Sequence, residues 1–328
     1  MADILSIAGQ NLLSPMVLFF ALGFMAALGR SDLSVPEAVA KALALYLMLS
    51  IGFKGGVELS RQGFEGPVPL ALLAGAVMSA ALPCLGFLIL RTTTRLKPAD
   101  AAAVSAHYGS ISVVTFVAAT EFLRVLGLPE TGYMVAVMAL METPAIVTGL
   151  LLARRAGGDQ MRGGLFDGRL AREVFLNGSV VLLVGAFLIG WISGDAGMTA
   201  LYPFLEAPFK GVLCLFLLDM GLVAAQRLRD ARGLGWATFA FGLYMPPING
   251  TLGALVGWMI GLDPAAITLL AVLCGSASYI AVPAAMRLAL PAASPSIYLT
   301  LSLAITFPFN LSVGIPLYHT LSIWLTGG

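Results

Sequence analysis

The sequence has 328 residues, of which 59% are hydrophobic and only 11% are charged, and its formal net charge is +1. Soluble domains carry about 25% charged residues, so this chain has too few charges to cover a soluble surface. The composition excludes an ordinary soluble enzyme and a disordered protein, and the lack of a basic tract excludes a nucleic-acid-binding protein. The mean hydropathy of +0.94 favours an all-α polytopic protein of the lipid bilayer.

Ten apolar runs follow one another along the chain, each long enough to cross a bilayer as a helix of about 20 residues. The first run lacks a basic flank and a small-residue cleavage site, so we interpret it as a span rather than as a signal peptide. The ten predicted spans lie near residues 12–29, 36–53, 67–91, 98–122, 132–153, 173–193, 208–225, 236–260, 264–290 and 297–324.

The longest polar connection, Ala153–Arg172, contains two Gly-Gly pairs and five arginines, and we interpret it as a flexible linker. It divides the chain into a first five-helix repeat at 1–153, a cytoplasmic linker at 154–172 and a second, inverted five-helix repeat at 173–328. Alternate connections hold 14 of the 18 lysines and arginines. Because basic residues favour the cytoplasmic side, both termini are predicted to be periplasmic, in a bacterial inner membrane.

Two stretches of the first half recur in the second half. Leu49–Gly52 resembles Leu218–Gly221, and Gly109–Ser112 resembles Gly275–Ser278. The proline of the fifth run also has a counterpart in the tenth. Five spans per half is an odd number, so the second half must enter the membrane upside down. Inverted five-helix repeats are typical of secondary transporters.

A Gly-Ser-x-Ser stretch lies in the middle of the fourth run and again in the ninth. Two such stretches at matching depth predict helices broken near the bilayer centre, with free N–H groups that favour an anion and free carbonyls that suit sodium. The alternative is that small residues only let helices pack closely. The candidate substrate-binding residues are Gly109, Ser110, Ser112, Gly275, Ser276 and Ser278.

Few ionisable side chains lie at membrane depth. Glu142 precedes a proline, and it is either an ion ligand or a cap of a local helix break. Asp219 is either functional or a lock between helices. Asn310 either donates to a substrate or satisfies a freed carbonyl. His107 and the three cysteines are interpreted as packing residues, so we expect no metal centre.

Three further charged residues stand near the ends of predicted spans. Lys54 and Glu58 flank a Gly-Gly pair just after the second run, and we interpret them as anchors at the membrane interface. Glu121 lies near the end of the fourth run and is assigned to the interface as well.

Several stretches resemble the sodium-dependent bicarbonate permease family of the SbtA type. They are Gly275–Arg287, Leu290–Pro291, Ser294–Tyr298, Ala304–Pro308 and Gly314–Leu317, and Gly109–Thr115 and Pro144–Thr148 are similar too. The most specific part runs from Ala277 to Leu317. The resemblance covers essentially the whole chain, with all ten spans in order. It implies an inverted-repeat transporter with a moving core and a scaffold or gate domain. It also implies a homotrimer, sodium coupling and bicarbonate as the substrate.

The resemblance also implies roles for single residues. Glu142 falls where the family has an acid before the proline, and Thr115 is one of its hydroxyls in the fourth span. Tyr279 stands where well-studied members carry an Asp, so one carboxylate that would compensate sodium is replaced. The linker is shorter than in those members, which leaves a PII-like regulatory partner open. The candidate ion-binding residues are Glu142, Thr115, Tyr279 and Asn310.

The leading hypothesis is a secondary active transporter of a small monovalent anion, most favourably sodium-coupled bicarbonate uptake by alternating access, with no cofactor other than the coupling ion. The alternatives are transport of another small anion, an organic acid or a neutral solute, with proton coupling or none, and a channel. An intramembrane enzyme is not expected. The sequence contains no Gly-x-Ser-x-Gly, no His-Glu-x-x-His and no aspartates paired on adjacent helices.

Overall fold

The computed structural model of the chain describes residues 12–63, 66–129, 131–156, 172, 176, 178–230 and 233–327. It is 83% helical, and no strand occurs among these residues. Within the same ranges, seven helices are long and apolar enough to cross a membrane, and two shorter apolar helices accompany them. The expectation of an all-α polytopic membrane protein is confirmed, while the count of ten spans stays a prediction.

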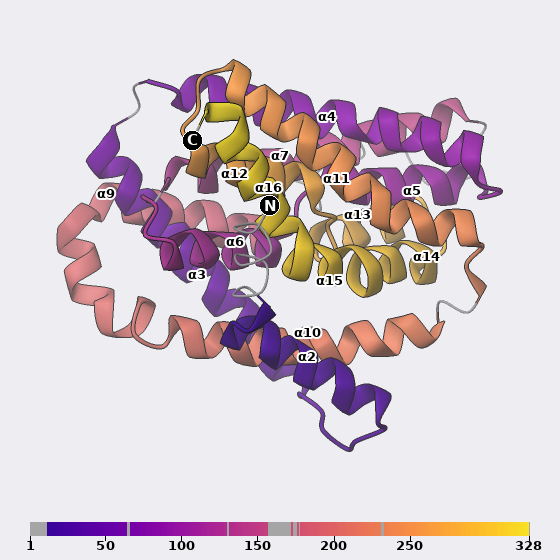
Figure 1. The fold of residues 1–328 in the computed structure, drawn as a ribbon, viewed down its shortest axis with the longest axis horizontal. Helices are drawn as coiled ribbons and strands as arrows, with labels where there is room; N and C mark the ends of the chain where they lie inside the picture. Colours follow the sequence, from indigo (N-terminus) through magenta and orange to yellow (C-terminus); the bar gives the residue numbers. More distant parts are fainter. Residues whose placement is uncertain are drawn as a thin grey trace.

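The helices follow the predicted apolar runs in order (Figure 1). The first half contains α2 (Pro15–Leu28), α3 (Glu37–Gln62), α4 (Val68–Thr93), α5 (Pro98–Gly109), α6 (Val113–Val125) and α7 (Tyr133–Arg155). The second half contains α9 (Gly178–Leu205), α10 (Phe209–Asp230), α11 (Trp236–Met259), α12 (Pro264–Gly275), α13 (Ala281–Ala289), α14 (Pro295–Leu299), α15 (Phe307–Phe309) and α16 (Ile315–Thr326), with π-helical turns on both sides of α15. Most of the predicted linker at 154–172 lies outside the described residues.

The predicted bounds differ from the helices in one informative place. The second run was expected to end near residue 53, but α3 continues to Gln62. Lys54 and Glu58 therefore lie within the helix and not at its end, while their role as anchors at the membrane interface stays a prediction. The two glycines within this helix let neighbouring helices approach closely: a Cβ on Gly55 would come within 2.5 Å of Val135 Cγ2, and a Cβ on Gly56 within 1.9 Å of the Phe187 carbonyl oxygen.

Helices α2, α3, α9 and α10 form one group, called here the outer group, in which α2 packs along α10 and α3 along α9. Glycines make the close approach of these helices possible. A Cβ on Gly221 would come within 2.1 Å of the Phe20 carbonyl oxygen. Much of α9 faces outward, and Ile192 on it is 83% exposed, as suits a helix in contact with lipid.

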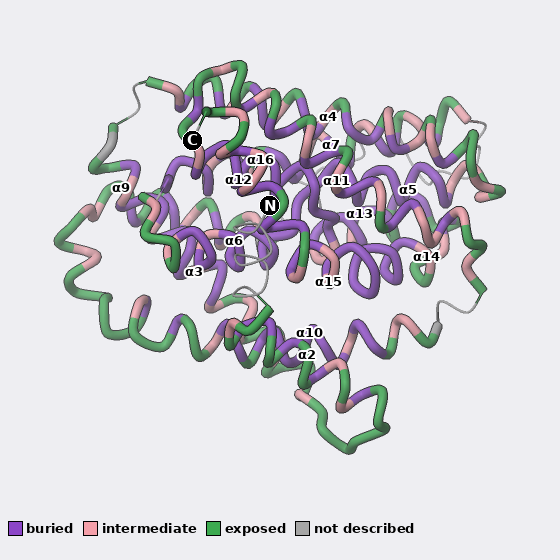
Figure 2. Tube along the Cα trace, viewed as in Figure 1, coloured by how far each residue is buried: buried purple, intermediate pink, exposed green. Residues whose placement is uncertain are grey.

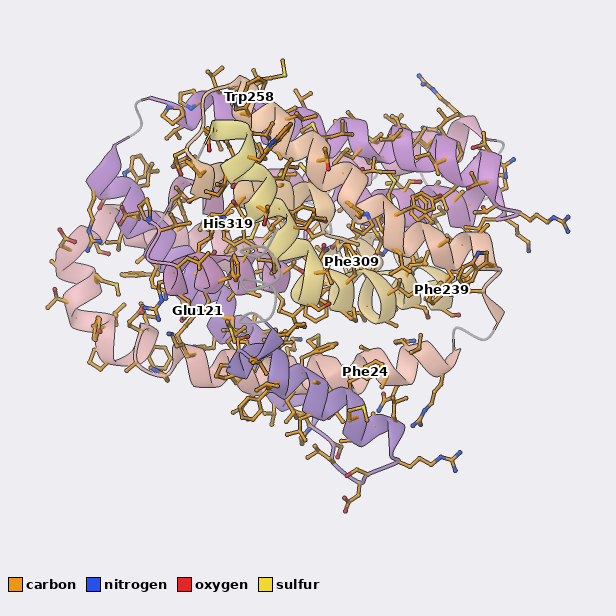
Figure 3. All side chains as sticks on the ribbon, in the orientation of Figure 1. Phe24, Glu121, Phe239, Trp258, Phe309 and His319 are labelled. Atoms are coloured by element: carbon orange, nitrogen blue, oxygen red, sulfur yellow. The ribbon has the colours of Figure 1, made fainter. Side chains whose placement is uncertain are left out.

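The other helices, α4 to α7 and α11 to α16, form a second group that encloses the broken helices. We call it the inner group. The 18-residue apolar window of α5 and α6 is wholly buried, and buried residues gather in the middle of the molecule (Figure 2). Trp258 is 49% exposed, whereas Glu121 is 4% exposed; both side chains are labelled in Figure 3. The inner group thus keeps its polar breaks away from lipid.

Candidate functional site

Two helices of the inner group are interrupted, and both interruptions follow a glycine. Helix α5 ends at Gly109 and α6 begins at Val113, whereas α12 ends at Gly275 and α13 begins at Ala281. The serine after each glycine is extended, with ψ of −175° and 169°. Serine favours helix ends because its hydroxyl bonds to nearby backbone groups. The predicted breaks lie where the Gly-Ser-x-Ser stretches stand.

The two breaks cross each other in the middle of the inner group. The Ser278 N–H donates to the His107 carbonyl over 2.8 Å, and the Ser112 N–H donates to Ser276 Oγ over 2.9 Å. All four residues are buried. The structure therefore brings together the six residues predicted to bind substrate, from stretches that are 164 positions apart along the chain.

The serine hydroxyls at the crossing differ in whether their own proton is already used in a hydrogen bond. Ser112 Oγ accepts from the Thr115 N–H and the Thr115 hydroxyl over 3.2 and 2.9 Å, and Ser278 Oγ accepts from the Val282 N–H over 3.5 Å. A hydroxyl that only accepts still has its own proton to donate. Ser276 Oγ instead donates to the Leu273 carbonyl over 2.9 Å, so its proton is already used.

The carbonyl ends of the first half-helices are bound by two asparagines. Asn249 Nδ2 donates to the Tyr108 carbonyl over 3.1 Å, and Asn310 Nδ2 donates to the Gly275 carbonyl over 2.8 Å. Tyr318 in turn donates to Asn310 Oδ1 over 3.1 Å. Asn310 was expected either to donate to a substrate or to satisfy a freed carbonyl, and its hydrogen bond to Gly275 is of the second kind. Each carbonyl keeps one lone pair for a further partner.

Asn249 was missed by the sequence reasoning, although a signal was present. It stands within an apolar run, two residues after the double proline Pro246-Pro247. A polar side chain at membrane depth is a candidate functional residue by its position alone. The sequence reasoning considered the two prolines of this run and not the asparagine. In α11 the side chain is fully buried, and its Oδ1 has no hydrogen-bond partner among the described residues.

Several other buried polar atoms near the breaks also lack a hydrogen-bond partner within the described part of the chain. Buried polar groups in proteins are normally paired, so each is available to a ligand, an ion or a water molecule. His107 binds the Ala103 carbonyl through Nδ1 and stacks on Tyr298 at 4.3 Å between ring centroids, as expected for a packing residue. The unpaired atoms are Ser110 Oγ, Asn249 Oδ1, Tyr279 Oη, Glu142 Oε2 and His107 Nε2.

Glu142 lies on α7, which packs against α5. The contact passes through Gly149, where a Cβ would come within 2.5 Å of Ala106 Cβ. Glu142 is two turns before Gly149, or about 10 Å along the axis. Along α4, Gly75 and Ser79 meet α7 at Val137 and Met141, in rising order, whereas Ser79 and Gly86 meet α5 at Gly109 and Ser105, in falling order, so α5 runs antiparallel to α7. The carboxyl group is therefore level with the break after Gly109. It is buried, with 4% of the residue exposed.

The turn of α7 that carries Glu142 is held by a side chain from α4. Ser79 Oγ donates to the Met141 carbonyl and accepts from the Ala145 N–H over 3.2 Å. Pro144 has no N–H, so it weakens the helix at this turn, and the Ser79 hydroxyl bridges the next backbone pair, the Met141 carbonyl and the Ala145 N–H. Asp219 lies elsewhere, on α10 of the outer group, and its role stays open.

The chain matches the family model of the Na+-dependent bicarbonate transporter superfamily over residues 15–322, which is nearly its whole length. A search of curated proteins gives no match. The family match extends over both broken helices, both asparagines and Glu142. The match therefore concerns nearly the whole chain and not one motif.

Proposed function

The chain belongs to the Na+-dependent bicarbonate transporter superfamily, and we propose that it takes up a small monovalent anion, bicarbonate first, together with sodium. Family membership makes it a membrane transporter and not an enzyme, and the family resemblance noted in the sequence is confirmed. The observation that carries the proposal is the crossing of the two breaks, where Ser112 and Ser278 keep a proton to donate next to the first turns of α6 and α13.

The chemistry of the crossing suits an anion of low charge. The first turns of α6 and α13 supply the positive ends of two helix dipoles. Ser112, Ser278 and the unpaired hydroxyl of Ser110 add hydrogen-bond donors. No lysine or arginine lies within residues 109–115 or 275–282. Such a site holds one negative charge without a full positive charge, so the anion binds reversibly.

The proposed sodium site draws on the unpaired oxygen atoms at the same depth. Asn249 Oδ1, Glu142 Oε2 and the Tyr279 hydroxyl are buried and unpaired among the described residues, whereas the Thr115 hydroxyl donates to Ser112. Carbonyl and carboxylate oxygens are suitable ligands for sodium in broken-helix transporters. The bound anion offsets the sodium charge, so the tyrosine at 279 is compatible with cotransport.

We further propose that the two halves are inverted repeats and that transport occurs by alternating access, with the inner group moving against the outer group. One pair of contacts supports the repeat. Gly52 on α3 packs against Leu183 of α9, and its counterpart Gly221 on α10 packs against Phe20 of α2. In the proposed repeat, α3 of the first half corresponds to α10 of the second, and α2 corresponds to α9. The α3–α9 contact at Gly52 is therefore equivalent to the α10–α2 contact at Gly221.

The proposal extends to the setting of the protein in the cell. It places the chain in a bacterial inner membrane with periplasmic termini, as a homotrimer with a short cytoplasmic linker. Exposed apolar side chains on α9 and α2, such as Ile192 and Met25, supply surface for lipid or for neighbouring subunits. A PII-like protein remains a candidate partner of the cytoplasmic side.

The direct test is uptake of labelled bicarbonate by proteoliposomes, with and without an inward sodium gradient. We expect concentrative, saturable uptake that requires sodium. Formate, nitrate and acetate in the same assay test whether another small anion or an organic acid is the substrate. Uptake that ignores sodium and follows a pH gradient would contradict sodium coupling, and non-saturable flux would indicate a channel.

A further inference from the structure

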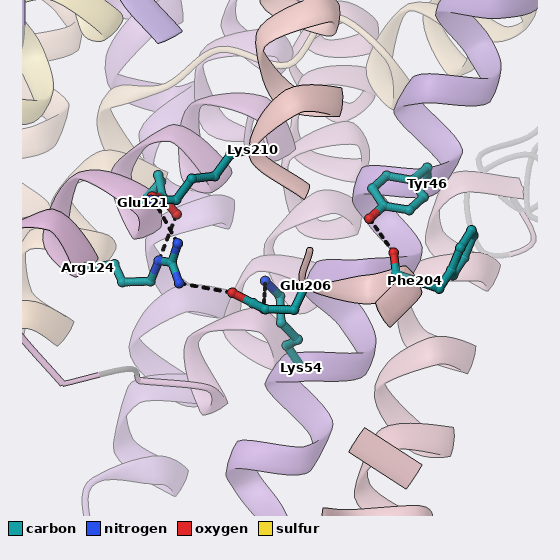
Figure 4. A network of polar contacts seen from close by, with 7 residues as sticks. All are labelled: Tyr46, Lys54, Glu121, Arg124, Phe204, Glu206 and Lys210. Atoms are coloured by element: carbon teal, nitrogen blue, oxygen red, sulfur yellow. Dashed lines mark hydrogen bonds and ion pairs between the residues drawn. The ribbon is translucent and has the colours of Figure 1, made fainter. Parts of the chain in front are cut away.

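Five charged side chains form a continuous network away from the helix crossing (Figure 4). Lys54 Nζ lies 2.9 Å from Glu206 Oε2, and Glu206 Oε1 lies 2.9 Å from Arg124 Nη1. Arg124 Nε lies 2.9 Å from Glu121 Oε2, and Lys210 Nζ lies 2.6 Å from Glu121 Oε1. None of these contacts is used by the proposed anion and sodium sites.

The network joins the two groups of helices. Lys54 belongs to α3, Lys210 to α10, and Glu206 to the turn between α9 and α10, all in the outer group. Glu121 and Arg124 belong to α6, the second half of a broken helix in the inner group. A movement of α6 relative to the outer group must therefore stretch or break these ion pairs.

A small cavity of about 40 Å³ lies beside the network, between α3, α6 and α7. Lys54, Glu121 and Arg124 line it together with Thr131, and Phe116 is part of its apolar wall. A cavity of this size has room for a few water molecules, or for a small anion in their place. Phe116 is one turn along α6 from Ser112, about 6 Å along the axis, so α6 connects the cavity wall to the crossing.

Cations outnumber carboxylates among the described residues that line the cavity. Lys54 and Arg124 are the cations, and Glu121 is the carboxylate. The Lys54 and Glu121 side chains are only 15% and 4% exposed, so solvent screens them weakly. Thr131 Oγ1 lines the same cavity, is buried, and has no hydrogen-bond partner among the described residues. Two cationic side chains and a hydroxyl with no partner among the described residues are hydrogen-bond donors that suit a monovalent anion.

We propose that this cavity is an outer anion site, a second binding site in which Lys54, Arg124 and Thr131 hold a small monovalent anion before it reaches the helix crossing. The inference rests on the proposed anion transport. The anion accepts hydrogen bonds from Lys54 and Arg124, and it thereby competes with Glu206 for both cations. Binding weakens the tie between α6 and the outer group, which couples arrival of the anion to release of α6.

The test measures charge selectivity at the cavity without relying on transport. Thr131→Cys is introduced into a chain whose three native cysteines are replaced by alanine, and the purified protein is treated with methanethiosulfonates that carry either a sulfonate or a trimethylammonium group. We expect the anionic reagent to react roughly tenfold faster than the cationic one. Sodium bicarbonate should slow the reaction saturably, whereas sodium gluconate, whose anion is too large, should not.

The decisive comparison removes one charge at the cavity. Lys54→Met should bring the two labelling rates together, and Lys54→Gln serves if the first variant does not fold. Lys41→Met is the matched control, since Lys41 is exposed on the same helix and lies 13 residues away, about 20 Å along the axis. It should keep the full preference, because that distance exceeds the Debye length of about 8 Å.

Three outcomes would overturn the outer anion site. The two reagents could react at equal rates, the preference for the anionic reagent could survive Lys54→Met, or neither reagent could label the protein. These outcomes leave the uptake experiment untouched. Conversely, failure of bicarbonate uptake with the labelling preference intact would contradict the proposed function while leaving the cavity as an anion site. The two proposals therefore fail in distinguishable ways.

Discussion

Serine side chains at the crossing serve both the fold and the proposed site, and the hydrogen bonds separate the two roles. Ser276 uses its proton on the Leu273 carbonyl and accepts from the Ser112 N–H. Its hydroxyl is therefore structural. Ser112 and Ser278 accept from backbone N–H groups of their own half-helices, so each has a proton to donate. The Ser112 proton can go to a ligand or to the neighbouring Tyr279 hydroxyl.

Ser112→Ala and Ser278→Ala should each weaken bicarbonate binding by about 1 kcal/mol, or roughly fivefold in Kd, because one donated hydrogen bond is lost. Calorimetry on purified protein measures this. Ser105→Ala is the matched control, since the Ser105 hydroxyl bonds only to Ala101 within α5. Ser112→Asp and Ser278→Asp should abolish binding by repulsion. Folded Asp variants that still transport normally would place the site elsewhere.

Glu142 is the acidic residue that we propose for the ion site. Glu142→Gln removes its charge at nearly constant volume, so it should raise the sodium concentration needed for half-maximal uptake. Tyr279→Asp restores a carboxylate beside the crossing and should lower that concentration. Uptake measured against sodium concentration in proteoliposomes checks both. An unchanged sodium dependence in both variants would exclude this pair from ion binding.

At the scale of the element, close helix packing in the outer group depends on glycine at defined positions. On α10, a Cβ at Gly221 would come within 2.1 Å of the Phe20 carbonyl oxygen, whereas a Cβ at Gly211 would meet no atom within 4 Å. The same helix thus offers one glycine required by a neighbour and one that is not.

Gly221→Ala should lower stability by about 1–3 kcal/mol, because the added methyl group forces α10 away from α2. Gly211→Ala should leave stability unchanged or raise it by about 0.5–1 kcal/mol, because alanine is the better helix former. Thermal unfolding of the detergent-purified variants compares them directly. Equal losses in the two variants would mean that α2 and α10 do not pack as the structure shows.

At the scale of the whole molecule, the distribution of basic residues predicts the orientation in the membrane. A cysteine placed at Gly328 should react with an impermeant reagent in intact cells, and one placed at Gly163 should react only after lysis. Both positions lie outside the described residues, so labelling is the appropriate measurement. The reverse pattern would contradict the periplasmic termini and the cytoplasmic linker.

The sequence alone determined the class of protein, the order of the apolar helices and the positions of both breaks. Runs of bilayer length must be helical, because the bilayer offers no other partner for the backbone. Glycine followed by serine ends a helix through local chemistry. These features depend on neighbours in the chain, and for that reason the pattern of residues was sufficient to predict them.

Only the tertiary structure decided which distant side chains meet. Asn249 binds the Tyr108 carbonyl across 141 positions, and Lys54 pairs with Glu206 across 152 positions. In the sequence, Lys54 and Glu121 looked like interface anchors because each stands near the end of an apolar run. Lys54 pairs with Glu206 of the α9–α10 turn, and Glu121 pairs with Lys210 of α10 as well as with Arg124 of its own helix. Which distant segments become neighbours is set by packing over the whole molecule, which no local pattern records.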